Sequence, residues 1–168
     1  YAVMPYEAKR GNAGLYYTGK TIHVLFTIAR LLNDADVDVY TDEFDTKMKM
    51  LANFFLDADK DNSLIYPWAK YKLHNKGNYK IQKRTHANYA WVPAFLYHYD
   101  DKFLVEKIYA SKPIQDYIIK EMQLSKNGGQ WGLIDPKCIY PGAISNFSKQ
   151  SKIQERLPKY RAVVKNKT

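Results

Sequence analysis

The chain has 168 residues, of which 46% are hydrophobic and 15% aromatic, which excludes an intrinsically disordered protein and suits one domain with a sizeable core. Its formal net charge of +9 is unevenly spread: residues 1–60 carry nine acidic and seven basic side chains, whereas residues 61–168 carry eight and nineteen. Such asymmetry is typical of an acidic ion-binding or interaction region beside a basic face for nucleic acid, anionic lipid or an acidic protein.

Residues 1–19 predict an irregular N-terminal arm, because glycines at positions 11, 14 and 19 interrupt a tyrosine-bearing stretch. The sequence starts at Tyr1 and not at a methionine. Removal of a mitochondrial transit peptide would leave such a start on a basic protein, and so would truncation of a longer chain. We therefore expect an intracellular protein, with the mitochondrion as the compartment that this start suggests.

Residues 21–32 predict the first strong helix, because eight apolar side chains cover most of its circumference. A bilayer span takes about 20 residues, so this helix is too short to cross a membrane. We therefore expect a buried central helix, or a helix of which one face meets a partner.

After this helix, two successive runs place carboxylates at alternate positions. The candidate metal ligands of the first run are Asp34, Asp36, Asp38, Tyr40 through its carbonyl, Asp42 and Asp45, and those of the second are Asp57, Asp59 and Asp61. This spacing resembles the calcium-binding loop of the EF-hand family, in which side chains at alternate positions, one backbone carbonyl and a closing carboxylate surround the ion. The resemblance implies a helix–loop–helix shape and a Ca²⁺ site.

Both runs depart from the family pattern. Val39 stands in the first run where the family has a glycine, and Asp45 is a methylene shorter than the usual closing glutamate. In the second run, Trp68 stands where the closing carboxylate is expected. We therefore expect Ca²⁺ binding to be weak or absent. An alternative without metal is that Asp42 caps the next helix, with Asp45 in its first turn.

Further helices are expected over residues 42–56, 67–75, 101–110 and 113–124, which with the first makes about five. In the helix over residues 42–56, the side chains of Phe44, Met48, Leu51 and Phe55 share one face and predict core positions. The expected fold class is therefore all-α, with an EF-hand-like core over residues 20–147 and an irregular arm at each end.

Two segments are strongly basic. The first holds Lys70, Lys72, Lys76, Lys80, Lys83 and Arg84, and the second, a C-terminal arm over residues 148–168, holds Lys149, Lys152, Arg156, Lys159, Arg161, Lys165 and Lys167. Cations interleaved with tyrosines suit RNA, because the cations neutralise phosphates and the rings stack on bases. They suit anionic lipid or an acidic protein subunit equally well.

The sequence contains no nucleophile elbow, zinc motif or dinucleotide fingerprint, which favours a non-catalytic protein over an enzyme. Arms rich in tyrosine, lysine and proline are typical of subunits that reach across their neighbours. The leading hypothesis is therefore a structural accessory subunit of a larger multi-protein complex, without a transmembrane segment. Two alternatives stay open: a calcium-binding regulatory protein and an RNA-associated basic protein.

Overall fold

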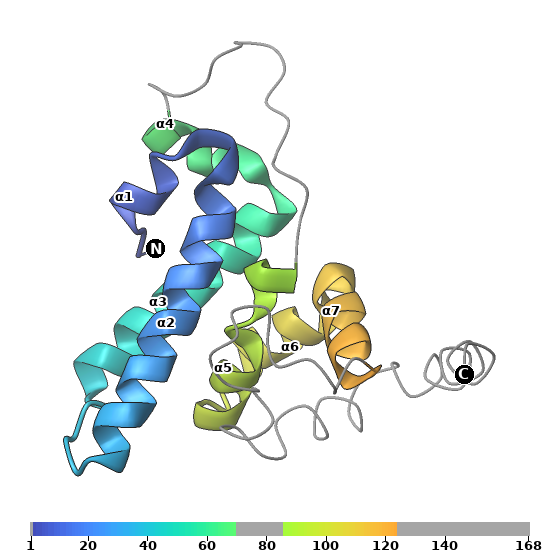
Figure 1. Ribbon diagram of the computed structural model, residues 1–168. Coiled ribbons are helices and arrows are strands. Elements are labelled where there is room, and N and C mark those ends of the chain that lie inside the picture. The colour runs from blue at the N-terminus through green and yellow to red at the C-terminus, as the bar shows by residue number, and fades with distance from the viewer. Residues whose placement is uncertain (1, 70–85, 124–168) are drawn as a thin grey trace. The chain divides into compact units, whose positions relative to one another are not determined.

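The computed structural model describes residues 2–69 and 86–123 (Figure 1). Every regular element in these two ranges is helical, which confirms the predicted all-α class. None of the helices found there combines the length and the apolar character that a membrane span requires. The chain divides into two compact units, Tyr1–Val92 and Pro93–Thr168.

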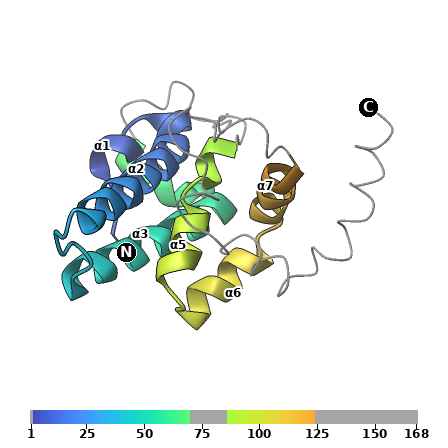
Figure 2. The same cartoon turned by 60° about the horizontal axis from the view of Figure 1, so that its bottom comes forward.

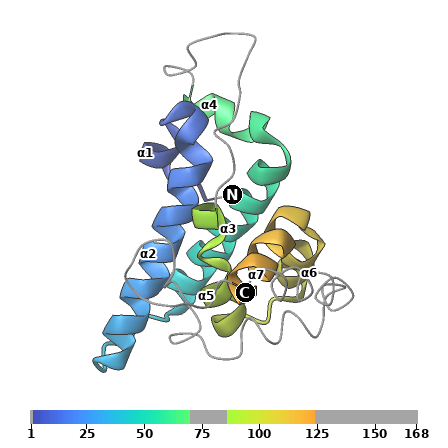
Figure 3. The ribbon, with the colours of Figure 1, turned by 45° about the vertical axis from the view of Figure 1, so that its right-hand side comes forward.

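The first unit is built around a hairpin of two long helices. Its elements in chain order are α1 (Pro5–Ala8), the 3₁₀ turn η1 (Gly11–Ala13), α2 (Gly14–Asp34), α3 (Asp42–Lys60), η2 (Asn62–Ile65), α4 (Tyr66–Ala69) and η3 (His86–Tyr89). Helices α2 and α3 lie side by side and are joined by residues 35–41 (Figures 1 and 3). Because α2 also contacts α1 and η3, it is the central element of the unit.

The N-terminal region differs from the irregular arm expected over residues 1–19. It contains α1, and α2 begins at Gly14 instead of Thr21. Close packing explains the difference: a Cβ atom at Gly14 would lie 3.0 Å from the carbonyl oxygen of Ala8. The hydroxyl of Thr18 also donates a hydrogen bond to the Gly14 carbonyl at 2.9 Å. Tertiary packing here outweighs the low helix propensity of glycine.

Helix α2 meets η3 at Gly19. A Cβ atom at Gly19 would lie 2.4 Å from the carbonyl oxygen of Asn88 and 3.0 Å from the ring of Phe55. Glycine is required at this position, because any side chain would push the two backbones apart. The fully buried side chains of Ile22 and Phe26 follow on the same face of α2.

The core of the first unit is aromatic. The ring of Phe55 on α3 stands edge-on to the rings of Tyr89 and Trp91, with centroids 6.1 Å and 5.4 Å apart. All three side chains are at most 3% exposed. Edge-to-face pairs stabilise a fold by about 0.5–1.5 kcal/mol each beyond the burial of their area. Phe55 therefore ties α3 to the segment that contains η3.

Helix α3 presents the predicted core face. Met48 and Phe55 are buried as expected, and Phe44 is half-buried. The helix begins after Thr41, whose hydroxyl oxygen accepts a hydrogen bond from the Phe44 N–H at 3.2 Å. The expectation that Asp42 caps this helix is wrong, because Thr41 is the residue with extended backbone at the N-cap position.

The second unit has three described helices: α5 (Val92–His98), which begins at the boundary between the units, α6 (Lys102–Ala110) and α7 (Lys112–Gln123). Helices α6 and α7 pack against each other (Figure 2). Asp101 caps α6 by accepting a hydrogen bond from the Leu104 N–H at 3.1 Å. The helices predicted over residues 101–110 and 113–124 agree closely with α6 and α7.

Of the two arrangements expected for this helix, burial on all sides is not found in α2. Ile22, Phe26 and Ala29 are buried, whereas Val24 and Ile28 are each 48% exposed. Burial on all sides was the wrong alternative, because both faces of the helix are apolar and only one of them packs against the rest of the unit. The other alternative, a face that meets a partner, stays a prediction.

Two isoleucines on α2 test this assignment of faces. Ile22→Ala is expected to lower the free energy of unfolding by about 2–5 kcal/mol, because its 0% exposed side chain would leave a cavity. Ile28→Ala should lower it by less than about 1 kcal/mol, because much of this side chain already contacts solvent. Urea denaturation of the full chain measures both values, and equal losses would contradict the assignment.

Candidate functional site

The first acidic run spans the end of α2, the turn at residues 35–41 and the first turn of α3. Asp34 is the last residue of α2, and Asp36 has a φ of 60°, a left-handed conformation that aspartate tolerates better than most residues. Asp38 is exposed, and the ring of Tyr40 stands edge-on to Phe44 with centroids 5.6 Å apart. The turn therefore gathers carboxylates at one end of the hairpin, mostly facing solvent.

Several carboxylates at this end interact with cations or with the start of α3. Asp34 pairs with Arg30 at 2.9 Å. Glu43 accepts a hydrogen bond from Lys47, and this bond lowers the pKa of the Glu43 carboxyl. The acidic side chains of the first turn of α3 are Asp42, Glu43 and Asp45. The partial positive charge of the helix N-terminus stabilises carboxylates in this position without any metal.

The second acidic run is not a loop at its start, because α3 continues through Asp57 and Asp59. Asp59 is 5% exposed, and the hydroxyl of Tyr89 lies 3.2 Å from each of its carboxylate oxygens. Asp61 follows the helix, where hydrogen bonds from the side chain and the backbone N–H of Ser63 lower the pKa of its carboxyl. The three aspartates therefore occupy different surroundings instead of one loop.

Within residues 2–69 and 86–123, no three His, Cys, Asp or Glu side chains are grouped so that they could hold a metal ion. The carboxylates of the first run lie on both sides of the turn between α2 and α3 and within it, without forming such a group. Ca²⁺ binding by this turn stays a prediction of the sequence.

Helix α2 carries exposed apolar side chains on the face away from Ile22. We name this face the apolar stripe; it consists of Val24, Ile28, Leu31 and Leu32, which are 48%, 48%, 55% and 39% exposed. Their spacing places them on one side of the helix. Val37, 47% exposed, extends the apolar surface into the acidic turn. A contiguous apolar face of this kind is typical of a surface that contacts another protein.

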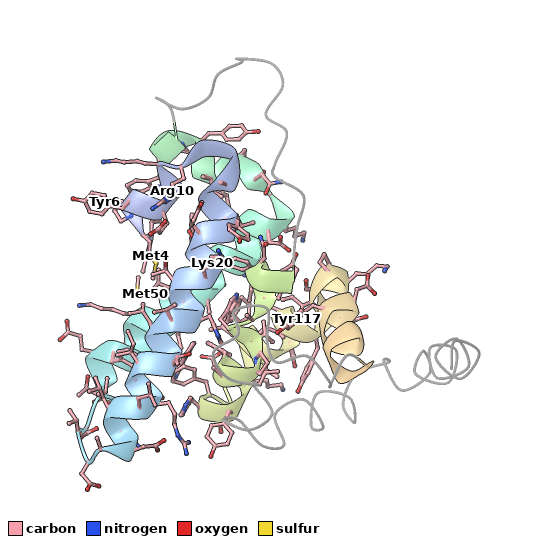
Figure 4. All side chains as sticks on the ribbon, viewed as in Figure 1. Met4, Tyr6, Arg10, Lys20, Met50 and Tyr117 are labelled. Carbon is pink, nitrogen blue, oxygen red and sulfur yellow. The ribbon has the colours of Figure 1, made fainter. Side chains whose placement is uncertain are left out.

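The other end of the apolar stripe is basic. The ammonium of Lys20 lies 4.3 Å from the ring centroid of Tyr16 and 5.6 Å from that of Tyr17. The guanidinium of Arg10 lies 4.1 Å from the Tyr17 centroid. Figure 4 shows Lys20 on α2 and Arg10 close to the start of that helix. Cations therefore stand at one end of the stripe and carboxylates at the other.

Three contacts of the first unit were not predicted from the sequence. Asn88 packs on Gly19, Tyr89 donates to Asp59, and the backbone of Ala90 hydrogen-bonds the ring of His23, whose pKa is lowered by burial. One signal was present for the second contact: Ala52, Phe55 and Asp59 share the spacing of one helical face. The other two contacts join α2 to residues 88 and 90, which are far away in the sequence. Local patterns do not reveal such contacts.

The other predicted binding residues lie outside the described ranges. They are the six cations of residues 70–84 and the seven cations of residues 148–168. Cys138, expected as a buried thiol, lies there too.

Tyr89→Phe tests the buried contact with Asp59. We expect it to lower the free energy of unfolding by about 1–3 kcal/mol, because a buried carboxylate loses a hydrogen-bond donor. The matched control is Tyr97→Phe, whose side chain is 42% exposed. That control should change the value by less than about 0.5 kcal/mol. Urea denaturation at neutral pH measures the free energy of unfolding of both variants. An unchanged value for Tyr89→Phe would show that the contact with Asp59 contributes nothing to stability.

Ca²⁺ is expected to bind the turn between α2 and α3 weakly. Val39 and the short Asp45 should weaken binding. We therefore expect a dissociation constant of about 10⁻⁴–10⁻³ M, the range typical of calcium sites in extracellular modules. Calorimetric titration of the full chain measures it. Submicromolar binding, or a heat signal that persists in both Asp34→Ala and Asp36→Ala, would rule out this site.

Comparison of the chain with models of protein families, with curated proteins and with solved structures finds no match in any of the three. The resemblance to the EF-hand family therefore rests on the spacing of the acidic residues alone.

Proposed function

We propose that this chain is a non-catalytic accessory subunit that acts by binding protein within a larger assembly. The observation that supports the proposal is the apolar stripe of α2, where Val24, Ile28 and Leu31 are each about half exposed. Exposed apolar surface costs free energy in water, and a partner that covers it recovers that energy.

The shape of the stripe favours a helical partner surface. Residues spaced by three and four along a helix form a ridge that packs into the groove of a second helix. Figure 1 shows α2 as a long helix of the hairpin, so the ridge is presented on a regular, preformed scaffold. A preformed surface loses little conformational entropy on binding, which favours specific association over loose adhesion.

A calcium-binding regulatory protein is the second candidate. One observation favours it: α2 ends at Asp34 and α3 begins at Asp42, which are the places where the two helices of a helix–loop–helix would flank the first acidic run. In that case the ion would act on the turn between the helices, next to the apolar stripe.

Contact with RNA or anionic lipid through the two basic segments also stays a proposal from the sequence, as does a mitochondrial setting for the assembly. Lysines and arginines at that density would make such contact strongly dependent on salt. Binding to protein through the stripe would depend on salt far less, because apolar burial is not screened.

Ile28→Asp tests the proposed function. Tagged full-length protein, returned to the cells it comes from, should lose most of the proteins that co-purify with the unmodified chain, because a carboxylate now lies in the middle of the stripe. The matched control is Thr46→Asp, which adds the same charge at an exposed position of α3. Quantitative mass spectrometry compares the three preparations. Identical sets of co-purifying proteins would contradict a docking role for the stripe.

A further inference from the structure

We propose that the apolar stripe of α2 binds the same stripe on a second copy of this chain, with the two α2 helices antiparallel. The inference rests on the proposed function, because it names the partner of the same surface. It is carried by a self-complementary pattern: α2 has apolar side chains along the stripe, Lys20 at one end of it and the acidic turn after Asp34 at the other.

The pattern is centred on Ile28. A two-fold axis there would bring Ile28 of one copy onto Ile28 of the other, because closed dimers use the same patch on both subunits. Each remaining residue then faces the one that lies equally far on the other side of the axis. Val24 faces Leu32, and Leu31 faces Leu25, a partly buried residue beside the stripe, so apolar side chains meet apolar side chains.

The charges at the two ends follow the same symmetry. Lys20 on α2 lies eight residues before Ile28, and Asp36 lies eight residues after it, in the turn that follows the end of α2 at Asp34. An antiparallel pair therefore brings the basic end of each α2, with Lys20, alongside the acidic turn of the other copy, with Asp36, once at each end. A parallel pair would instead place Asp36 and Asp38 beside their own copies, where like charges repel. Antiparallel helices also align their dipoles favourably.

The exposed area of the apolar stripe determines how tightly two copies are expected to bind. The stripe has four side chains between 39% and 55% exposed, and Val37 adds a fifth at 47%. Five half-exposed side chains per copy make a small interface, of the size class below about 1,200 Å² in total that is typical of weak and transient complexes. We therefore expect a monomer–dimer equilibrium that depends on concentration.

Sedimentation equilibrium on the full chain, over a roughly hundredfold range of concentration, tests the inference. The unmodified protein should change from monomer to dimer as its concentration rises. Lys20→Asp and Asp36→Lys should each weaken the dimer about tenfold, because each variant replaces two attractive contacts by two repulsive ones. Ile28→Asp should remain monomeric throughout. Thr46→Asp, on α3, should dimerise as the unmodified protein does. Circular dichroism verifies that each variant is folded.

A mixture of the two charge variants gives the decisive result. When Lys20→Asp and Asp36→Lys proteins are combined, each contact of the mixed pair joins a carboxylate to an ammonium, so the mixed dimer should be within about threefold of the unmodified one in affinity. The double variant, which carries both Lys20→Asp and Asp36→Lys, should regain dimer affinity to the same extent as the mixture.

Failure of the inference and failure of the proposed function are distinguishable. If the chain stays monomeric at every concentration, or if mixing the charge variants restores nothing, the second copy is not the partner. The proposed function then survives only if Ile28→Asp still removes co-purifying proteins, in which case a different protein covers the stripe. A monomeric chain whose co-purifying proteins are unchanged by Ile28→Asp overturns both.

Discussion

The first unit depends on the contact between α2 and η3, where the backbone at Gly19 lies so close to Asn88 that a Cβ atom would stand 2.4 Å from the Asn88 carbonyl oxygen. This contact holds the segment after residue 86 against the hairpin. Tyr89 then reaches Asp59, and Trp91 packs against Phe55. A side chain at position 19 would disturb all of these contacts together, because a close-packed core transmits such a displacement.

The contact of the η3 segment with the hairpin also explains why Asp59, an aspartate of the second acidic run, is buried. A carboxylate that is 5% exposed is costly unless hydrogen bonds replace the water it has lost, and the Tyr89 hydroxyl supplies one such bond. Aspartates at alternate positions resemble a calcium-binding loop if the chain is assumed to be extended there. On a helix, however, Asp57 and Asp59 point to different sides, so one stays half-buried while the other enters the core.

The parts of the fold that could be predicted from sequence are those that local patterns determine. The core face of α3 and the extents of α6 and α7 follow from helical periodicity, and Asp101 is an ordinary N-cap residue. The helix before Thr21 could not be predicted, because its glycines lower helix propensity and are tolerated only through packing on Ala8 and Asn88. For the candidate site, periodicity predicted an apolar α2 but not which of its faces is exposed.

Gly19 explains which face of α2 turns toward η3. The buried face includes Gly19, where neighbouring backbone approaches closely, beside the large side chains of Ile22 and Phe26, whereas the apolar stripe offers only branched side chains such as Ile28 and Leu31. Close approach to η3 is possible only on the first face. The apolar stripe suits contact between whole helices, whose axes lie about 8–10 Å apart and whose side chains interdigitate. The residues that fold the unit and those proposed to join it to a partner are thus separated on a single helix, so substitutions at Ile28 can weaken association while the core around Gly19 stays intact.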